Sequence, residues 1–267
     1  MKKGEAAGLL LAVDIGNTTV GVGVFDGPRL VCDWKIRSDR EKTADEYGVI
    51  LVGLLAGAGL GPERVSQVIL SSVVPPLTPV FQAMSRNLFG AKAVVVGPGL
   101  KTGMPILTEN PFEVGADRIV AAVAAYEKHG GPCLIVDFGT AITFDAVSAK
   151  GEYLGGAIAP GIQIAAESLS LRTAKLPRVE IVRPSKVIGR TTTASMQAGL
   201  FHGYVGLITH LIAEMKKELS AEAKVVVTGG FAELFLPYIP ALDLHEPHLV
   251  LEGLKILFER SRGSSER

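Results

Sequence analysis

The stretch LLLAVDIGNTT, residues 9–19, decides the fold. Its five leading apolar residues end at Asp14, and the segment that follows holds a glycine and polar side chains, which indicates a buried strand that ends in a turn. The β-branched residues 19–25 predict a second strand. A turn at residues 26–28 and a third strand at residues 30–36 follow. We therefore expect a three-stranded antiparallel meander at the start of the chain.

The same order of features returns in the second half of the chain. The apolar run 133–136 ends at Asp137 and is followed by Phe138, Gly139 and Thr140. Further strands are predicted at residues 142–147 and 153–158, with a turn at Lys150 and Gly151 between them. The repetition predicts two related α/β halves, residues 1–114 and 115–267, connected through the proline- and glycine-rich stretch 97–111.

Other elements follow from apolar spacing and from cap residues. The helix after the first meander is expected to begin after Thr43, a candidate cap. The tail from Ser261 is expected to be disordered. Helices are predicted over residues 44–55, 78–88, 117–128, 161–169 and 194–217, and strands at residues 67–73, 93–96 and 225–227.

The composition is that of a globular chain with a sizeable core. Of 267 residues, 48% are hydrophobic, and the 27 basic side chains balance the 27 acidic ones, so no basic field points to a nucleic acid or a membrane surface. No run approaches the ~18 apolar residues of a membrane helix, and residues 8–13 are too few for a signal sequence. We expect a cytoplasmic protein in which Cys32 and Cys133 are buried free thiols.

The first turn has the composition of a phosphate-binding loop. Gly16 lets a ligand approach the main chain, and Thr18 and Thr19 offer hydroxyl donors. Asp14, at the end of its strand, can orient a hydrated Mg²⁺. One such turn alone is equally compatible with an ordinary hairpin in which Asp14 and Asn17 stabilise the turn.

The second turn favours the functional interpretation. The chain has two matched turns with an aspartate and a glycine, and each turn ends an apolar strand and opens one half. A kinase that binds ATP between two domains requires such a pair. The stretch VVVTGG, residues 225–230, runs from a strand into a glycine pair, which suits contact with the base or ribose of a nucleotide. These patterns predict an ATP-dependent small-molecule kinase.

The chain carries four motifs in a fixed order: DIGNT (14–18), GADR (115–118), DFGTA (137–141) and GGAIAPG (155–161). Together they resemble the type III pantothenate kinases, members of the actin/hexokinase/Hsp70 superfamily. The resemblance implies an α/β fold of two ribonuclease-H-like (actin-like ATPase) domains facing an ATP cleft. It implies that ATP phosphorylates the primary hydroxyl of pantothenate to 4'-phosphopantothenate, the first step of coenzyme A biosynthesis. It also implies a homodimer that requires K⁺ or NH₄⁺.

The resemblance also assigns roles to particular residues. The segment Asp14 to Gly21 matches the ATP-phosphate loop, Asp117 the general base, Asp137 the ligand of the monovalent cation and Thr140 an ATP contact. The segment Gly115 to Arg118 and Thr192 match the pantothenate-binding residues. The implied ATP-binding residues are Asp14, Ile15, Gly16, Asn17, Thr18, Thr19, Val20, Gly21 and Thr140, and the implied substrate-binding residues are Gly115, Ala116, Asp117, Arg118, Thr192 and Thr108.

Physical chemistry supports the role of Asp117 independently of the resemblance. Phosphoryl transfer needs a carboxylate that accepts the proton of the attacking hydroxyl, and the start of a helix favours a carboxylate and an anionic ligand. The alternative is that Glu113, Asp117 and Arg118 are only capping charges. No Gly-x-x-x-x-Gly-Lys-Ser/Thr loop is present, so a K⁺ near Asp137 would offset phosphate charge in place of the missing lysine.

The chain departs from the family pattern at one position, and two alternative functions stay open. Many members of the family have a tyrosine where this chain has Thr108, which bears on substrate packing and leaves the phosphate and base motifs unaffected. A sugar or acetate kinase of the same superfamily is one alternative, and the GADR motif argues against it. An accessory transcription factor is the other, and the net charge of zero argues against DNA binding.

Overall fold

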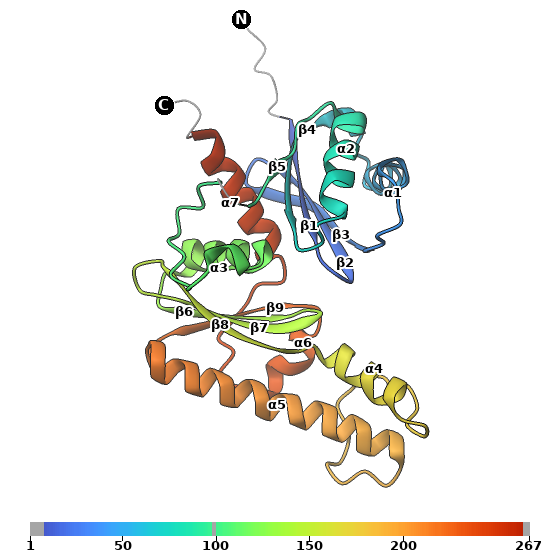
Figure 1. Cartoon of the computed structure of the whole chain (residues 1–267), viewed down its shortest axis with the longest axis vertical. Coiled ribbons are helices and arrows are strands. Elements are labelled where there is room, and N and C mark those ends of the chain that lie inside the picture. Colours follow the sequence, from blue (N-terminus) through green and yellow to red (C-terminus); the bar gives the residue numbers. More distant parts are fainter. Residues whose placement is uncertain (1–7, 98–99, 264–267) are drawn as a thin grey trace, which may run out of the picture. The chain divides into compact units, whose positions relative to one another are not determined.

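The computed structural model describes residues 8–97 and 100–263, which form two five-stranded sheets with helices around them (Figure 1). The strand order is β3-β2-β1-β4-β5 in the first sheet and β10-β9-β6-β7-β8 in the second. The strands are β1 (Leu9–Ile15), β2 (Thr19–Asp26), β3 (Arg29–Arg37), β4 (Val65–Ser72), β5 (Val94–Val95), β6 (Cys133–Phe138), β7 (Ala141–Val147), β8 (Tyr153–Pro160), β9 (Lys224–Gly229) and β10 (Leu244–His245).

The second sheet repeats the topology of the first. In the first, β1 and β2 and then β2 and β3 pair antiparallel, while β1 with β4 and β4 with β5 pair parallel. In the second, β6, β7, β8, β9 and β10 take the same places in the same order. The predicted meanders and the repeated α/β plan are therefore confirmed.

The predicted helices are present with small shifts of their ends. Thr43 caps α1, since its hydroxyl accepts the N–H of Glu46 while the Glu46 carboxylate accepts the N–H of Thr43. The helices are α1 (Ala44–Gly57), α2 (Leu77–Phe89), α3 (Ala116–His129), α4 (Ile162–Arg172), α5 (Thr192–Leu219), α6 (Ala232–Phe235) and α7 (Leu249–Gly263).

The chain divides into two compact units. The first combines residues up to 103 with residues 110–124 and those from 250 onward, and the second combines residues 104–109 with 125–249. The first part of α3 thus belongs to the first unit, and its last residues to the second. The division of the chain into halves at residues 114 and 115 stays a prediction.

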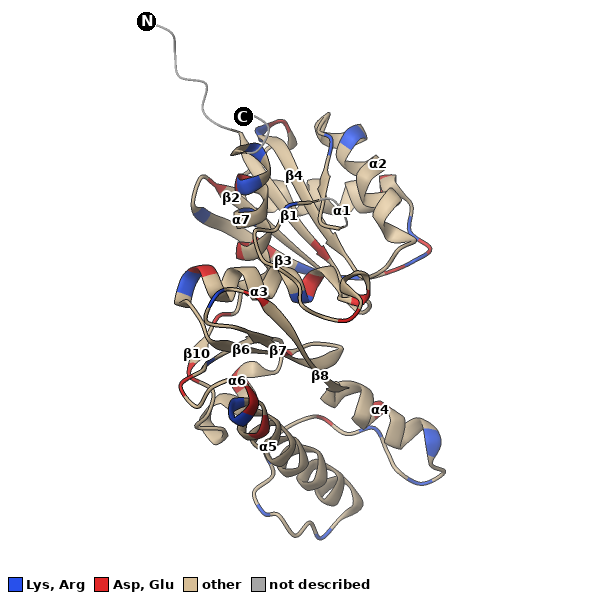
Figure 2. Cartoon of the chain, turned by 60° about the vertical axis from the view of Figure 1, so that its left-hand side comes forward, with Lys and Arg blue, Asp and Glu red and all other residues tan. Residues whose placement is uncertain are grey.

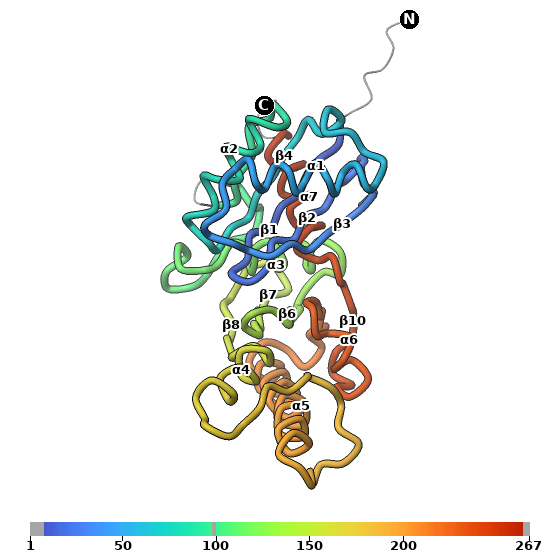
Figure 3. Tube along the Cα trace, turned by 90° about the vertical axis from the view of Figure 1, so that its right-hand side faces the viewer, coloured from blue at the N-terminus to red at the C-terminus, as the bar shows by residue number. Residues whose placement is uncertain are grey.

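In the first unit, helices cover both faces of the sheet. Tyr47, Leu51 and Phe81 of α1 and α2 pack with the buried residues of β1 and β2 on one face. On the other face α7 lies against β2 (Figures 1 and 3), and a Cβ added to Gly23 would lie 3.0 Å from Leu251. A glycine at this position therefore allows the helix to approach the sheet closely.

The end of α7 departs from the expectation for the tail. The helix continues through Ser261 to Gly263, so the prediction of disorder is wrong for these residues, while residues 264–267 lie outside the described part of the chain. Leu254 and Leu257 are fully buried. This apolar face anchors the helix in the core, and the last turn continues the helix from these anchored turns.

In the second unit, aromatic side chains fill the core between the sheet and α5. The rings of Phe138 and Phe201 each stack on Phe235, with centroids 5.4 and 5.3 Å apart. Cys133 is buried, which raises the pKa of its thiol to about 12. Cys32, in the first unit, is free as predicted but only half-buried, because it lies on the outermost strand of its sheet.

Candidate active site

The first predicted turn lies where two parallel strands end side by side. Asp14 is the next-to-last residue of β1, and its parallel neighbour on β4 is Ser71. The Ser71 hydroxyl donates a 2.6 Å hydrogen bond to Oδ1 of Asp14. Carboxyl ends of parallel strands meet at one edge of a sheet, which is where open α/β sheets bind ligands.

The turn itself exposes main chain and hydroxyl groups. The N–H of Gly16 donates to the Thr19 carbonyl at 3.0 Å, and an added Cβ on Gly16 would lie only 2.9 Å from that oxygen. Asn17, Thr18 and Thr19 are exposed. The turn is therefore tight, bare of a side chain at its glycine and open to a ligand, as a phosphate loop must be.

Three predicted ATP-binding residues could meet a ligand only through the main chain. The side chains of Ile15 and Val20 are fully buried in the core, so only their backbone groups can meet a ligand. Gly21 is the antiparallel partner of Asp14, and a Cβ added to it would lie 3.9 Å from Cβ of Asp14. Gly21 thus borders the carboxylate of Asp14.

Asp117 belongs to the same unit and lies in the first turn of α3. Its Oδ1 accepts a 2.8 Å hydrogen bond from the N–H of Arg118, one of the N–H groups at the helix start that have no carbonyl partner within the helix. A Cβ added to Gly115 would lie 2.5 Å from Oδ1 of Asp117 and 3.5 Å from Val73. Gly115 therefore leaves the space that the carboxylate needs. Ala116 is the first residue of the helix.

The two carboxylates of this unit, Asp14 and Asp117, both have a raised pKa. Burial, the largest cause, and the charge of Asp117 together raise the pKa of Asp14 to about 7, while the hydrogen bond from Ser71 opposes the rise. Burial likewise raises the pKa of Asp117, while the N–H and the guanidinium of Arg118 oppose the rise. Two carboxylates that are shielded from water and have raised pKa values are typical of a functional site, because their burial does not stabilise the folded protein.

The second predicted turn occupies the matching place in the other unit. Asp137 is again the next-to-last residue of its strand, and its parallel neighbour on β9 is Thr228. Gly229 has φ +96, and a Cβ added to it would lie 2.5 Å from Oδ1 of Asp137. This turn is one residue shorter than the first, since two residues separate β6 from β7 and three separate β1 from β2.

The remaining predicted residues of the second unit lie on three different elements. Thr140 is exposed in the turn, and its carbonyl accepts the N–H of Gly161 at 3.1 Å. Thr192 is exposed at the start of α5, directly after the cap residue Thr191. Thr108 lies beside β8, and its hydroxyl is buried without a hydrogen-bond partner among the described residues.

Sequence analysis missed Ser71 as a member of the site. The strand over residues 67–73 was predicted, but the serine within it was not singled out. A polar residue near the end of an otherwise apolar strand was the available signal, because it has to lie at the edge where β1 also ends. What could not be read from the sequence is that β4 is the parallel neighbour of β1.

The distribution of charges, of possible metal ligands and of apolar helices bears on what the described residues can bind. Acidic and basic residues are both spread over the elements of each unit (Figure 2). Within the described residues, no group of three or more His, Cys, Asp or Glu side chains forms a cluster for a metal ion. No helix in that part of the chain has the length and apolar character needed to cross a membrane.

Known protein sequences match this chain over most of its length. The sequence model of a family described as type III pantothenate kinase matches residues 10–214. The type III pantothenate kinase of Geobacter sulfurreducens is 53% identical over 254 residues, covering 95% of this chain and 100% of its own. That of Moorella thermoacetica is 54% identical over 253 residues, with the same two coverages.

The solved structures bear on the fold alone. MreB 5 of Spiroplasma citri bound to AMPPNP aligns with a TM-score of 0.56 and 12% identity, over 98% of this chain and 99% of that one. The predicted fold of two actin-like domains is confirmed.

Proposed function

Because the chain belongs to the type III pantothenate kinase family, we propose that it transfers the γ-phosphoryl group of ATP to the primary hydroxyl of pantothenate. The product is 4'-phosphopantothenate, and the reaction opens coenzyme A biosynthesis. The observation that supports this most strongly is the pair Asp14 and Asp117: both carboxylates have a raised pKa, and Asp14 lies directly before an open phosphate turn. The use of ATP agrees with a cytoplasmic location.

Asp117 is the proposed general base. Its carboxylate accepts the proton of the pantothenate hydroxyl as that oxygen attacks the phosphorus atom. Burial makes the carboxylate more basic, since its pKa is raised, while the Arg118 N–H fixes its orientation. The Arg118 guanidinium is proposed to hold the pantothenate carboxylate, for which its planar fork is well suited.

Asp14 and the turn after it are proposed to hold the ATP phosphates and Mg²⁺. The carboxylate of Asp14 and the hydroxyl of Ser71 are oxygen donors, the kind that Mg²⁺ prefers. Since no larger cluster of ligands is present among the described residues, the phosphates and water would supply the other positions. When bound, Mg²⁺ offsets negative charge on the phosphates, and the N–H groups of the turn orient them.

Asp137 is proposed to bind the monovalent cation, K⁺ or NH₄⁺. The residues fit such a role, because Gly229 keeps space open at the carboxylate and the hydroxyl-bearing Thr143 and Thr228 pair with Asp137 on its two sides. Thr140, in the same turn, is the proposed ATP contact. A bound cation would supply positive charge near ATP, which residues 14–21 lack.

Replacing K⁺ with Na⁺ is expected to lower the rate by about tenfold or more, because Na⁺ is too small for a site shaped to K⁺. The measurement is the steady-state rate in each salt at equal ionic strength. Asp137→Asn should reduce the difference between the salts, and Thr173→Ala, at an exposed position after α4, should leave it unchanged. Equal rates of the wild type in K⁺ and Na⁺ would contradict a K⁺-selective site.

Thr108 and Thr192 are the other proposed pantothenate contacts. Thr108 is the stronger of the two on structural grounds, because a buried hydroxyl without a partner carries a desolvation cost of roughly 1–3 kcal/mol that a ligand can relieve. The segment that carries it is fixed, since the N–H and carbonyl of Tyr153 bond to Pro105 and Leu107.

A substrate panel separates this function from its alternatives. With ATP, Mg²⁺ and K⁺, pantothenate is expected to give ADP at a rate far above that with acetate or a hexose. A higher kcat/KM for acetate or a sugar would replace the proposal with another kinase of the superfamily. Retention of duplex DNA in a salt-dependent manner would favour the transcription-factor alternative.

The chain is proposed to form a homodimer through the second unit. Large apolar side chains are exposed there on β8, on α4 and on the segment that follows α4. Exposed apolar groups in such numbers favour an interface. They include Ile158, Leu171, Val187 and Ile188, with exposed fractions of 64, 71, 64 and 85%. Light scattering after gel filtration should give twice the mass of 28.1 kDa. A monomer at micromolar concentration would contradict the dimer.

A further inference from the structure

Arg40 is an arginine beside the phosphate turn that no motif includes. It lies in the loop between β3 and α1, and its Nη2 donates a 3.3 Å hydrogen bond to Oδ1 of Asn17. Both side chains are exposed. Arg40 forms no ion pair among the described residues, so its positive charge meets only the neutral amide of Asn17.

The loop that carries Arg40 is held firmly in place. The N–H of Ser38 donates to the Thr18 carbonyl at 3.0 Å, which ties the start of the loop to the phosphate turn. The hydroxyl of Tyr47, whose ring is fully buried, accepts the N–H of Asp39 at 2.9 Å and donates to the Asp39 carbonyl at 3.0 Å. The residue directly before Arg40 is thus fixed at both of its main-chain polar groups.

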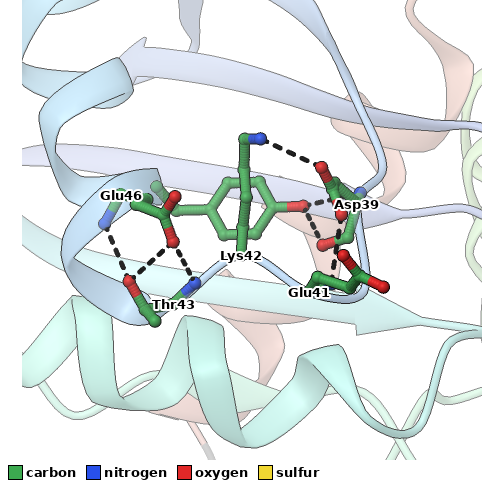
Figure 4. Close-up of polar contacts among 6 residues, drawn as sticks. Asp39, Glu41, Lys42, Thr43 and Glu46 are labelled. Atoms are coloured by element: carbon green, nitrogen blue, oxygen red, sulfur yellow. Dashed lines mark hydrogen bonds and ion pairs between the residues drawn. The ribbon is translucent and has the colours of Figure 1, made fainter.

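Most of the other charged side chains near Arg40 are already paired (Figure 4). Lys42 Nζ lies 3.0 Å from Oδ2 of Asp39, and the Glu41 N–H donates to Oδ1 of the same carboxylate. These contacts lower the pKa of Asp39 and keep it ionised. The Glu46 carboxylate is engaged by Thr43 in the capping box. Asp39 and Glu46 therefore have partners other than Arg40, and the Glu41 carboxylate forms no ion pair with it among the described residues.

A guanidinium in this position is suited to an anion. Residues 14–21 contain no lysine or arginine, so the turn proposed for the ATP phosphates carries no positive side chain of its own. Hydrogen bonds between charged partners are roughly twice as strong as neutral ones. A phosphate oxygen near Asn17 therefore competes well with the Asn17 amide for the Arg40 fork.

We propose that Arg40 binds the polyphosphate of ATP, exchanging Oδ1 of Asn17 for a phosphate oxygen, and supplies the positive charge that the phosphate turn lacks. The rigid loop is the device that holds the guanidinium beside the turn. This inference rests on the proposed binding of ATP by residues 14–21.

Nucleotide binding measured by calorimetry tests the proposal without relying on turnover. Arg40→Ala is expected to raise the Kd for ATP by about tenfold or more, as loss of a hydrogen bond to a charged group does. The Kd for adenosine, which has no phosphate, should not change. Arg40→Lys should fall between the wild type and Arg40→Ala, because lysine keeps the charge but loses the fork.

Two further variants control for charge and for loop structure. Arg29→Ala removes an exposed arginine at the far end of β2 and β3 from the phosphate turn and should leave the Kd for ATP unchanged. Tyr47→Phe removes the hydroxyl that fixes Asp39 and should weaken ATP binding in the same direction as Arg40→Ala, but less. Circular dichroism confirms that each variant is folded.

The outcomes separate this inference from the proposed function. If the wild type binds ATP and Arg40→Ala binds it equally well, Arg40 is not a phosphate ligand. If Arg40→Ala loses affinity for adenosine as much as for ATP, its role is structural, which also overturns the proposal. A folded wild type that binds no ATP at all would contradict the proposed function together with this inference.

Discussion

Asp117→Asn is expected to lower kcat by about 10²- to 10⁴-fold, the range that general acid–base catalysis contributes. The amide has the size of the carboxylate, and its oxygen can still accept the N–H of Arg118. It cannot accept the proton of the pantothenate hydroxyl. Affinity for ATP should change little, because the phosphate turn after β1 is intact.

Steady-state kinetics and ATP titration of the same preparation measure both expectations. The matched control is Glu113→Gln, which changes an exposed acidic side chain just before α3 whose Oε1 accepts a 2.7 Å bond from Asn110. The control should keep the wild-type rate. A kcat of Asp117→Asn within twofold of the wild type would show that Asp117 is a capping charge and not the base.

Asp14→Asn is expected to abolish most of the activity and yet to stabilise the folded protein near pH 8. Loss of activity follows from loss of the charge that is proposed to hold Mg²⁺. The gain in stability follows from the pKa of about 7, raised from 3.8 by burial and by the charge of Asp117. The amide relieves this cost and can still accept the Ser71 hydroxyl.

The ionisation of Asp14 makes the stability of the folded protein depend on pH. Between about pH 4 and 7 the folded protein keeps the Asp14 proton while the unfolded chain has lost it, so the contribution of Asp14 to stability falls as pH rises. Each pH unit in this window costs about 1.4 kcal/mol. Above pH 7 both states are ionised, and the cost stays at its maximum.

Thermal unfolding of the wild type and of Asp14→Asn at pH 4 and pH 8 measures this difference. The two proteins should unfold at similar temperatures at pH 4, and the variant at a temperature several degrees higher at pH 8. A variant that is less stable than the wild type at pH 8 would mean that the Asp14 carboxylate serves the fold. In that case Asp14 is not a strained group kept for function.

Much of the fold could be predicted because its signals are local. Alternation and β-branched residues mark the two meanders, and the repeated aspartate and glycine turns mark the equivalence of the halves. Thr43 and Glu46 have the spacing of a capping box, and the structure confirms that cap. The expected bounds of the helices are close to those observed for the same reason.

The remaining features depend on contacts between distant segments. Nothing local in residues 65–72 says that β4 lies beside β1, and therefore Ser71 could not be assigned to Asp14. The effect of Asp117 on Asp14 needs the first turn of α3 in the same compact unit as β1. Arg40 was missed because two whole strands, β2 and β3, lie between it and its contact Asn17 in the sequence.

The central claim is that this chain phosphorylates pantothenate with ATP. Its most direct test is to follow ADP and phosphorylated pantothenate together, by coupled assay and mass spectrometry, in a folded sample with Mg²⁺ and K⁺. We expect one phosphopantothenate for each ADP, and little ADP when pantothenate is omitted. ADP formation that is absent, or that proceeds equally without pantothenate, would contradict the claim.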